Sequence, residues 1–191
     1  PCISGTHGSG TVFFSGCNMK CVFCQNHNIA VGKAGRGVTA THLAEIFLSL
    51  QDKGANNINL VTPSHFVPQI CEALRLAKAQ GLCIPIVYNT GSYESVDTLK
   101  MLDGLVDVYL PDLKYYSPEL SGRYSHAEDY FAVAVKAIAE MFRQVGKPVF
   151  QPQKASQAPS AAQPDMMIRG IIVRHLVLPG QTKDSKKILR Y

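Results

Sequence analysis

Two kinds of hydrophobic pattern alternate along this chain. Leu43, Ile46, Phe47 and Leu50 recur at i, i+3, i+4 and i+7, which predicts an amphipathic helix that ends near Gly54. Further helices are expected at 67–81, 95–102 and 130–145, and short apolar runs predict strands at 11–14, 57–61, 84–88, 105–110 and 168–178. Strands that alternate with helices in this way are typical of a parallel sheet in an α/β fold.

One segment departs from the alternation. Residues 151–164 are small and polar with little to bury, so we expect a flexible loop at 151–165. The apolar strand expected beyond it carries two polar residues, Arg174 and His175. Because neighbouring residues of a strand face opposite sides, we expect at most one of them to face the interior. The other would extend toward solvent or cap a helix.

Composition is compatible with a single domain over residues 1–191. Hydrophobic residues make up 46% of the chain, enough for a sizeable core, and no run resembles a membrane span. The net charge is +5, and its densest run, 183–190, has the pattern of a solvated helix face without interleaved aromatic residues. This argues against a nucleic-acid partner. The chain starts at Pro1 and stops at Tyr191 inside an expected helix, so we expect the fold to be truncated at its C-terminus.

The most informative residues form a short loop after the first expected strand. Cys17, Cys21 and Cys24 are spaced as C-x3-C-x2-C. Thiolates are soft ligands that suit iron-sulfur clusters. Three protein ligands leave the fourth iron of a 4Fe-4S cluster open, as catalytic metal sites leave a coordination position open. The spacing therefore predicts a chemically active cluster.

The alternative is a noncatalytic module in which the three cysteines hold zinc or a purely structural iron-sulfur cluster. His27 follows Cys24 by three residues and would complete a set of three cysteines and one histidine in a noncatalytic binding module. Zinc ribbons usually pair two close ligands with two distant ones, whereas this loop begins a much larger α/β unit. Cys2, Cys71 and Cys83 are isolated, so we expect no disulfide framework and a reducing, cytoplasmic location.

Unusual residues follow the other expected strands. They are Thr62-Pro63, Asn89-Thr90-Gly91, Pro111-Asp112-Leu113-Lys114 and Pro179-Gly180. In a parallel barrel or half-barrel the carboxyl ends of the strands meet at one rim, where active sites of such folds lie. We therefore expect these residues and the cysteine loop to surround one site.

The loop Cys17-Asn-Met-Lys-Cys21-Val-Phe-Cys24 closely resembles the signature of radical S-adenosylmethionine (radical SAM) enzymes. Asn57-Ile-Asn-Leu-Val-Thr-Pro63 and Arg174-His-Leu-Val-Leu-Pro-Gly180 are similar to uncharacterised relatives in the pyruvate formate-lyase activating enzyme branch. The resemblance covers nearly the whole chain and implies a partial (β/α)6, TIM-like barrel. It also implies that S-adenosylmethionine binds the open iron and is cleaved reductively to a 5'-deoxyadenosyl radical, which abstracts a hydrogen atom.

The resemblance extends to individual residues. Asp112 and Lys114 resemble activase residues that contact S-adenosylmethionine, with Lys114 toward its carboxylate; the alternative is a surface ion pair beside a strand end. Asn89 and Thr90 resemble a turn beside the ribose. Phe23 would pack near the adenine, and Arg174 with Pro179-Gly180 resembles an Arg-x4-Pro-Gly stretch of the fifth strand.

One family motif is replaced. The usual Gly-Gly-Glu-Pro after the second strand, whose backbone receives the methionyl amine, is here Val61-Thr62-Pro63-Ser64. We expect Thr62 and Pro63 to occupy the position of this cofactor contact. The glutamate and both glycines are absent.

The branch that the chain resembles implies two protein partners. One is an electron donor such as flavodoxin or ferredoxin, and the other is a glycyl radical enzyme whose backbone glycine is the target of the radical. Radical modification of a small molecule or of another protein residue is the alternative, and no sequence feature separates the two.

Overall fold

The computed structural model describes residues 2–152 and 165–191; most of the loop expected at 151–165 lies outside the described residues. Within these ranges the strands form one sheet in the order β1-β2-β3-β4-β6-β5. The neighbours from β1 to β6 pair in parallel, and β5 pairs antiparallel to β6. The strands are β1 Gly10–Phe13, β2 Ile58–Val61, β3 Ile86–Thr90, β4 Val108–Pro111, β5 Val149–Gln151 and β6 Met166–Ile171.

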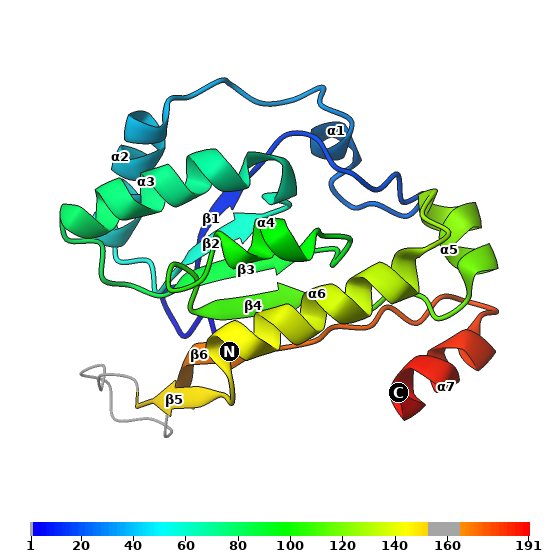
Figure 1. Ribbon diagram of the computed structural model, residues 1–191. Helices are drawn as coiled ribbons and strands as arrows, with labels where there is room; N and C mark the ends of the chain where they lie inside the picture. Colours follow the sequence, from blue (N-terminus) through cyan, green and yellow to red (C-terminus); the bar gives the residue numbers. More distant parts are fainter. Residues whose placement is uncertain (1, 153–164) are drawn as a thin grey trace.

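Four helices cover one face of this sheet (Figure 1). They are α2 Ala40–Asp52, α3 Val67–Ala79, α4 Val96–Lys100 and α6 Tyr130–Val145. Their apolar stripes and the sheet residues that face them form one fully buried cluster, with Phe47 of α2, Leu74 of α3, Leu99 of α4 and Met141 of α6 at its centre. Burial of this shared face fixes the position of the strands, and so of the loops that follow them.

The opposite face of the sheet carries a smaller apolar cluster. Val87, Val108 and Met167 pack there against Ile3 from the segment that precedes β1. This segment also bonds to two strand regions of the sheet: the backbone carbonyl of Ile3 accepts from the side chain of Asn57, just before β2, at 2.9 Å, and the carbonyl of Cys2 accepts from Met167 N–H in β6 at 2.6 Å. Among the described strands, β1 and β5 stand at the two ends of the order, so this sheet is open.

The remaining helices lie beyond the carboxyl ends of the strands. Figure 1 shows α1 His27–Ala30 and α5 Pro118–Ser125 there, beside the loop that follows β1, and α7 Thr182–Arg190 farther from it; a 3-10 turn, η1 Ser64–Phe66, follows β2. The Asp184 side chain of α7 accepts the backbone N–H groups of Tyr116 and Ser117 at 2.9 Å each. These bonds attach α7 to the start of α5, where a helix leaves N–H groups unpaired.

Most expected elements are present, with shifted boundaries. The run expected at 84–88 begins as a strand only at Ile86, after Pro85, which has no backbone N–H to donate to a neighbour. The strand expected at 168–178 was wrong in its second half: β6 ends at Ile171, and beyond it a single bridge joins Arg174 to Asp112. The short α5 and β5 were not predicted. No helix within 2–152 and 165–191 is long and apolar enough to cross a membrane.

Candidate functional site

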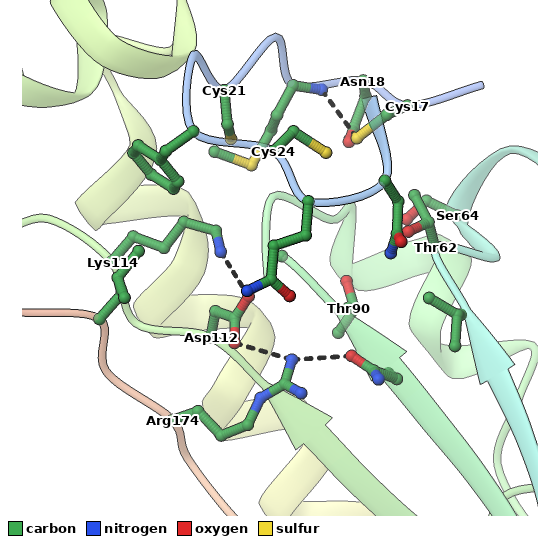
Figure 2. A pocket seen from close by; sticks show the side chains of 18 of the residues that line it. Cys17, Asn18, Cys21, Cys24, Thr62, Ser64, Thr90, Asp112, Lys114 and Arg174 are labelled. Carbon is green, nitrogen blue, oxygen red and sulfur yellow. Dashed lines mark hydrogen bonds and ion pairs between the residues drawn. The ribbon is translucent and has the colours of Figure 1, made fainter. Parts of the chain in front are cut away.

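A pocket of about 450 Å³ opens at the carboxyl ends of the strands. Its lining comes from the loop after β1, the ends of β2, β3 and β4, and residues 174–176 after β6, so residues that follow separate strands lie at one site (Figure 2). Pro179 and Gly180, which were expected there too, are not part of the lining. The expected site residues that line it are Cys17, Cys21, Phe23, Cys24, Thr62, Asn89, Thr90, Asp112, Lys114 and Arg174. Pro63 is buried outside this lining, at the start of η1.

The three cysteines of the loop lie along one side of the pocket (Figure 2). The Sγ atom of Cys17 accepts from the backbone N–H of Met19 at 3.4 Å. Burial raises the pKa of the Cys17 thiol; the Met19 N–H opposes this, and charge on Cys21 and Cys24 adds to it. A bound cation reverses this balance, since a coordinating thiol is deprotonated.

The cysteine loop is attached to α5. The backbone N–H of Val22 donates to the carbonyl of Tyr124 at 2.9 Å, and that of Lys20 to the carbonyl of Ser125 at 3.3 Å. The hydroxyl of Ser125 donates to Cys21 Sγ at 2.9 Å. The end of α5 thus holds the middle of the loop at both backbone and side chain.

The three thiols of this loop are soft ligands of the kind that suits an iron-sulfur cluster. In the part of the chain that the structure describes, no three His, Cys, Asp or Glu side chains are grouped as a single metal ion would need. His27, which the zinc alternative needs, is exposed in α1 and does not line the pocket.

Across the pocket from the cysteines, two cationic side chains share one carboxylate (Figure 2). Asp112 accepts from the ammonium of Lys114 and from Arg174 Nη2, the latter at 2.7 Å. The same guanidinium donates to Asn89 Oδ1 at 2.7 Å. The side chains of Lys114 and Asp112 are only 14% and 21% exposed, so they are not the solvated surface pair that the sequence left open. Two cations and one anion leave one positive charge in excess.

His175 binds the same segment from its other side. Its Nδ1 donates to the carbonyl of Leu113 at 2.6 Å, and its Nε2 lies 2.8 Å from Ser185 Oγ in α7. Arg174 and His175 both contribute to the pocket lining, but their side chains turn different ways: Arg174 bonds to Asp112 and Asn89, whereas the His175 ring bonds to Leu113 and to Ser185 of α7. One side chain therefore joins the charged residues of the pocket and the other contacts a helix, although β6 has already ended at Ile171.

The sequence reading missed Glu94. Its buried Oε1 accepts from the hydroxyls of Ser64 at 2.6 Å, Thr90 at 2.5 Å and Tyr88 at 3.2 Å. Burial raises the pKa of this carboxyl, and the three donors partly offset the increase. Ser64 and Thr90 both line the pocket, so Glu94 holds in place two pocket hydroxyls at the ends of different strands. A lone acidic residue just after the 89–91 turn was the only sequence signal.

Thr62, in the segment where the family's glycine-rich motif was expected, has an unusual backbone conformation. Its φ is 57°, in the left-handed region that favours glycine, and its N–H donates to the carbonyl of Asn89 at 3.0 Å. Thr62 therefore adopts, at the end of β2, a backbone conformation that glycine adopts more readily than threonine.

Tyr130 was also missed, although it connects the strand ends. Its buried hydroxyl lies 2.9 Å and 2.7 Å from the carbonyls of Gly91 and Asp112, and it accepts the backbone N–H of Lys114 at 3.1 Å. Phe23, whose ring centroid lies 6.4 Å from that of Tyr115, also lines the pocket.

The sequence is similar to those of known proteins. The sequence model of the Radical SAM superfamily matches residues 11–152. The chain is also 33% identical over 132 residues to a protein of Methanocaldococcus jannaschii described as "Uncharacterized protein MJ0674". The match covers 65% of this chain and 38% of the length of that relative.

Proposed function

This chain belongs to the radical SAM superfamily, and we propose that it binds a 4Fe-4S cluster through Cys17, Cys21 and Cys24 to cleave S-adenosylmethionine reductively. The observation that carries the proposal is that all three thiols line one pocket with charged residues on its facing side. When bound, the cluster and S-adenosylmethionine supply a 5'-deoxyadenosyl radical that abstracts a hydrogen atom from the substrate. The protein binds, orients and shields these groups.

The positive charge of the pocket suits the carboxylate of the methionyl end. Lys114 is mostly shielded from solvent, and Asp112 holds its ammonium in place. Arg174 holds the other oxygen of the same carboxylate, so the Asp112 side chain cannot turn away. A charge-assisted hydrogen bond to a positioned ammonium is stronger than a neutral one. We assign Lys114 as the carboxylate contact and Asp112 and Arg174 as its support.

Polar groups at the ends of β2 and β3 suit the nucleoside. Asn89, Thr90, Thr62 and Ser64 all line the pocket beside the cysteine loop. We assign Asn89 and Thr90 to the ribose side and Phe23 to the adenine. Thr62, with its left-handed backbone, takes the position of the methionyl amine contact. Pro63 is buried away from the lining, so it shapes the turn of η1 rather than touching the cofactor.

The open sheet suits a substrate that approaches from the side. We propose that its parallel strands are part of a partial (β/α)6 barrel, with the pocket at its rim. The similarity to the activating-enzyme branch supports a backbone glycine of a glycyl radical enzyme as the target and flavodoxin or ferredoxin as the electron donor. A small molecule or another protein residue is the alternative target.

Cysteine variants test the proposal. After anaerobic reconstitution with iron and sulfide, the wild type is expected to hold four irons per chain and to form 5'-deoxyadenosine from S-adenosylmethionine with dithionite. Cys21→Ala is expected to lose the cluster and all cleavage. Cys83→Ala, which changes an exposed cysteine outside the pocket lining, serves as the matched control and is expected to keep both. An active Cys21→Ala protein without a cluster would contradict the proposal.

The target requires a separate experiment. Addition of a glycyl radical enzyme to the reduced, loaded protein is expected to give a glycyl electron paramagnetic resonance signal on that partner. Deoxyadenosine formation that depends on a small metabolite, with no signal on the partner, would favour the alternative target.

A further inference from the structure

One of the three cysteines receives a hydrogen bond from a buried side chain. The hydroxyl of Ser125 donates to Cys21 Sγ at 2.9 Å, and Ser125 is 1% exposed. We propose that Ser125 is a positioning residue that raises the reduction potential of the cluster through this bond to Cys21. The inference rests on the proposed function, because it requires that Cys21 is a ligand of a 4Fe-4S cluster.

The backbone holds this contact in place. Ser125 is the last residue of α5, and its carbonyl accepts the N–H of Lys20, one residue before Cys21. The preceding carbonyl, of Tyr124, accepts the N–H of Val22, one residue after Cys21. The sulfur and the hydroxyl are thus brought together by backbone bonds on both sides. Burial of Ser125 also prevents water from taking the place of its hydroxyl.

A second hydroxyl fixes the direction of the bond. Tyr115 is also 1% exposed, and its hydroxyl lies 2.7 Å from Ser125 Oγ. A thiolate has no proton to give, so the proton of Ser125 points to Cys21 Sγ. Tyr115 must then donate to the oxygen of Ser125. The ring of Tyr115 packs edge-on against Tyr130, which fixes the start of this chain of donors.

The effect on the cluster follows from charge. Hydrogen bonds to the sulfur atoms are one of the factors that set the potential of an iron-sulfur cluster. Reduction adds one electron, and a donor stabilises the more negative state more strongly. Ser125 therefore favours the reduced cluster. Cys17 accepts its bond from the backbone of Met19, whereas the bond to Cys21 comes from a side chain and can be removed by substitution.

The experiment compares two serines of the same helix. Ser121 is also 1% exposed on α5, but its hydroxyl lies 3.1 Å from the carbonyl of Pro118 and does not bond a cysteine. The wild type, Ser125→Ala and Ser121→Ala are reconstituted anaerobically, and the midpoint potential of each cluster is measured by redox titration followed by electron paramagnetic resonance. Circular dichroism checks that each variant is folded.

Ser125→Ala is expected to have a more negative midpoint potential than the wild type. We expect a change of about threefold to tenfold in the reduction equilibrium, where tenfold is 59 mV for one electron. Ser121→Ala is expected to match the wild type. Equal potentials in the wild type and Ser125→Ala, or an equal change in Ser121→Ala, would overturn the inference.

A variant or wild-type protein that takes up no cluster also gives a decisive result. If Ser125→Ala takes up no cluster, Tyr115→Phe decides, because it removes the donor to Ser125 and is expected to shift the potential in the same direction by a smaller amount. An unchanged potential in Tyr115→Phe would then overturn the inference. If the wild type takes up no cluster, the proposed function fails and the inference fails with it. Absence of a cluster in the wild type is a different result from equal midpoint potentials in the wild type and Ser125→Ala, so the two failures can be told apart.

Discussion

Asp112 Oδ1 accepts a hydrogen bond at 2.7 Å from Arg174 Nη2, although the two residues follow different strands far apart in the sequence. A parallel bridge between their backbones aligns the end of β4 with the segment after β6. The other oxygen of the carboxylate binds Lys114. Two sequence motifs thereby become one charged side of the pocket, facing the three cysteines.

Loss of the Asp112 carboxylate should weaken S-adenosylmethionine binding without loss of the cluster. Asp112→Ala frees Lys114 and Arg174 to move or to bond elsewhere, and a hydrogen bond to a charged group contributes about 1.5–3 kcal/mol. We therefore expect a dissociation constant about tenfold to hundredfold higher. Calorimetry on the reconstituted protein measures it. Asp97→Ala removes the exposed pair with Lys100 and serves as the control; equal affinities in all three proteins would count against the assignment.

Removal of the Tyr130 hydroxyl should loosen the strand ends. Tyr130→Phe leaves the N–H of Lys114 without its buried acceptor and takes a donor from the carbonyls of Gly91 and Asp112. An unsatisfied buried group costs about 1–3 kcal/mol, and we expect the free energy of unfolding to fall by about that amount. Urea denaturation measures the change. Tyr191→Phe, at a residue 71% exposed, should leave stability unchanged.

The buried carboxyl of Glu94 should make stability depend on pH. Its pKa is raised by burial, so between the pKa of the unfolded chain and the raised pKa the folded state binds more protons. The free energy of unfolding therefore decreases as pH rises through this window. Glu94→Gln keeps an oxygen acceptor but cannot ionise.

Denaturation of the wild type and Glu94→Gln should thus agree in acid and diverge as pH increases, with the variant becoming the more stable protein. Glu72→Gln, at an exposed position of α3, is the control and should follow the wild type. A difference of constant size across the pH range, or a variant that becomes less stable as pH rises, would show that ionisation of Glu94 does not carry the effect.

Asp184 should stabilise the attachment of α7. Asp184→Ala removes the acceptors of the N–H groups of Tyr116 and Ser117, which immediately precede α5, and a hydrogen bond to a charged group contributes about 1.5–3 kcal/mol. We expect a lower free energy of unfolding by about that amount, measured by urea denaturation. Lys183→Ala, at the adjacent exposed position, should have little effect. Equal losses in the two variants would contradict a role of Asp184 in this attachment.

Periodic apolar residues located α2, α3, α4 and α6 because burial against the sheet depends on spacing along one helix. The cysteine loop could likewise be identified from spacing alone. By contrast, α5 could not be predicted from apolar spacing, because its buried residues are the serines Ser121 and Ser125. The contact between Ser125 and Cys21 joins residues 104 positions apart, and only the tertiary fold creates it.

The apolar run at 172–178 shows the opposite error. Its residues have high strand propensity, but a strand also needs a neighbour to share its backbone hydrogen bonds. Beyond Ile171 the backbone bonds to β4 and the segment after it only at Ile172 and Arg174 among the described residues, and Val173, Leu176 and Val177 remain exposed. Glu94 could not be predicted as a site residue for a related reason. Its role depends on the hydroxyls of Ser64 and Thr90, which lie at the ends of two different strands.

The most direct test of the central claim is electron paramagnetic resonance of the reconstituted, dithionite-reduced protein with and without S-adenosylmethionine. The account predicts a reduced 4Fe-4S signal that changes when S-adenosylmethionine is added, since the three cysteines leave one iron open to it. It also predicts that 5'-deoxyadenosine accumulates in the same sample. Stoichiometric zinc in place of the cluster, or a cluster signal that S-adenosylmethionine leaves unchanged, would contradict the account.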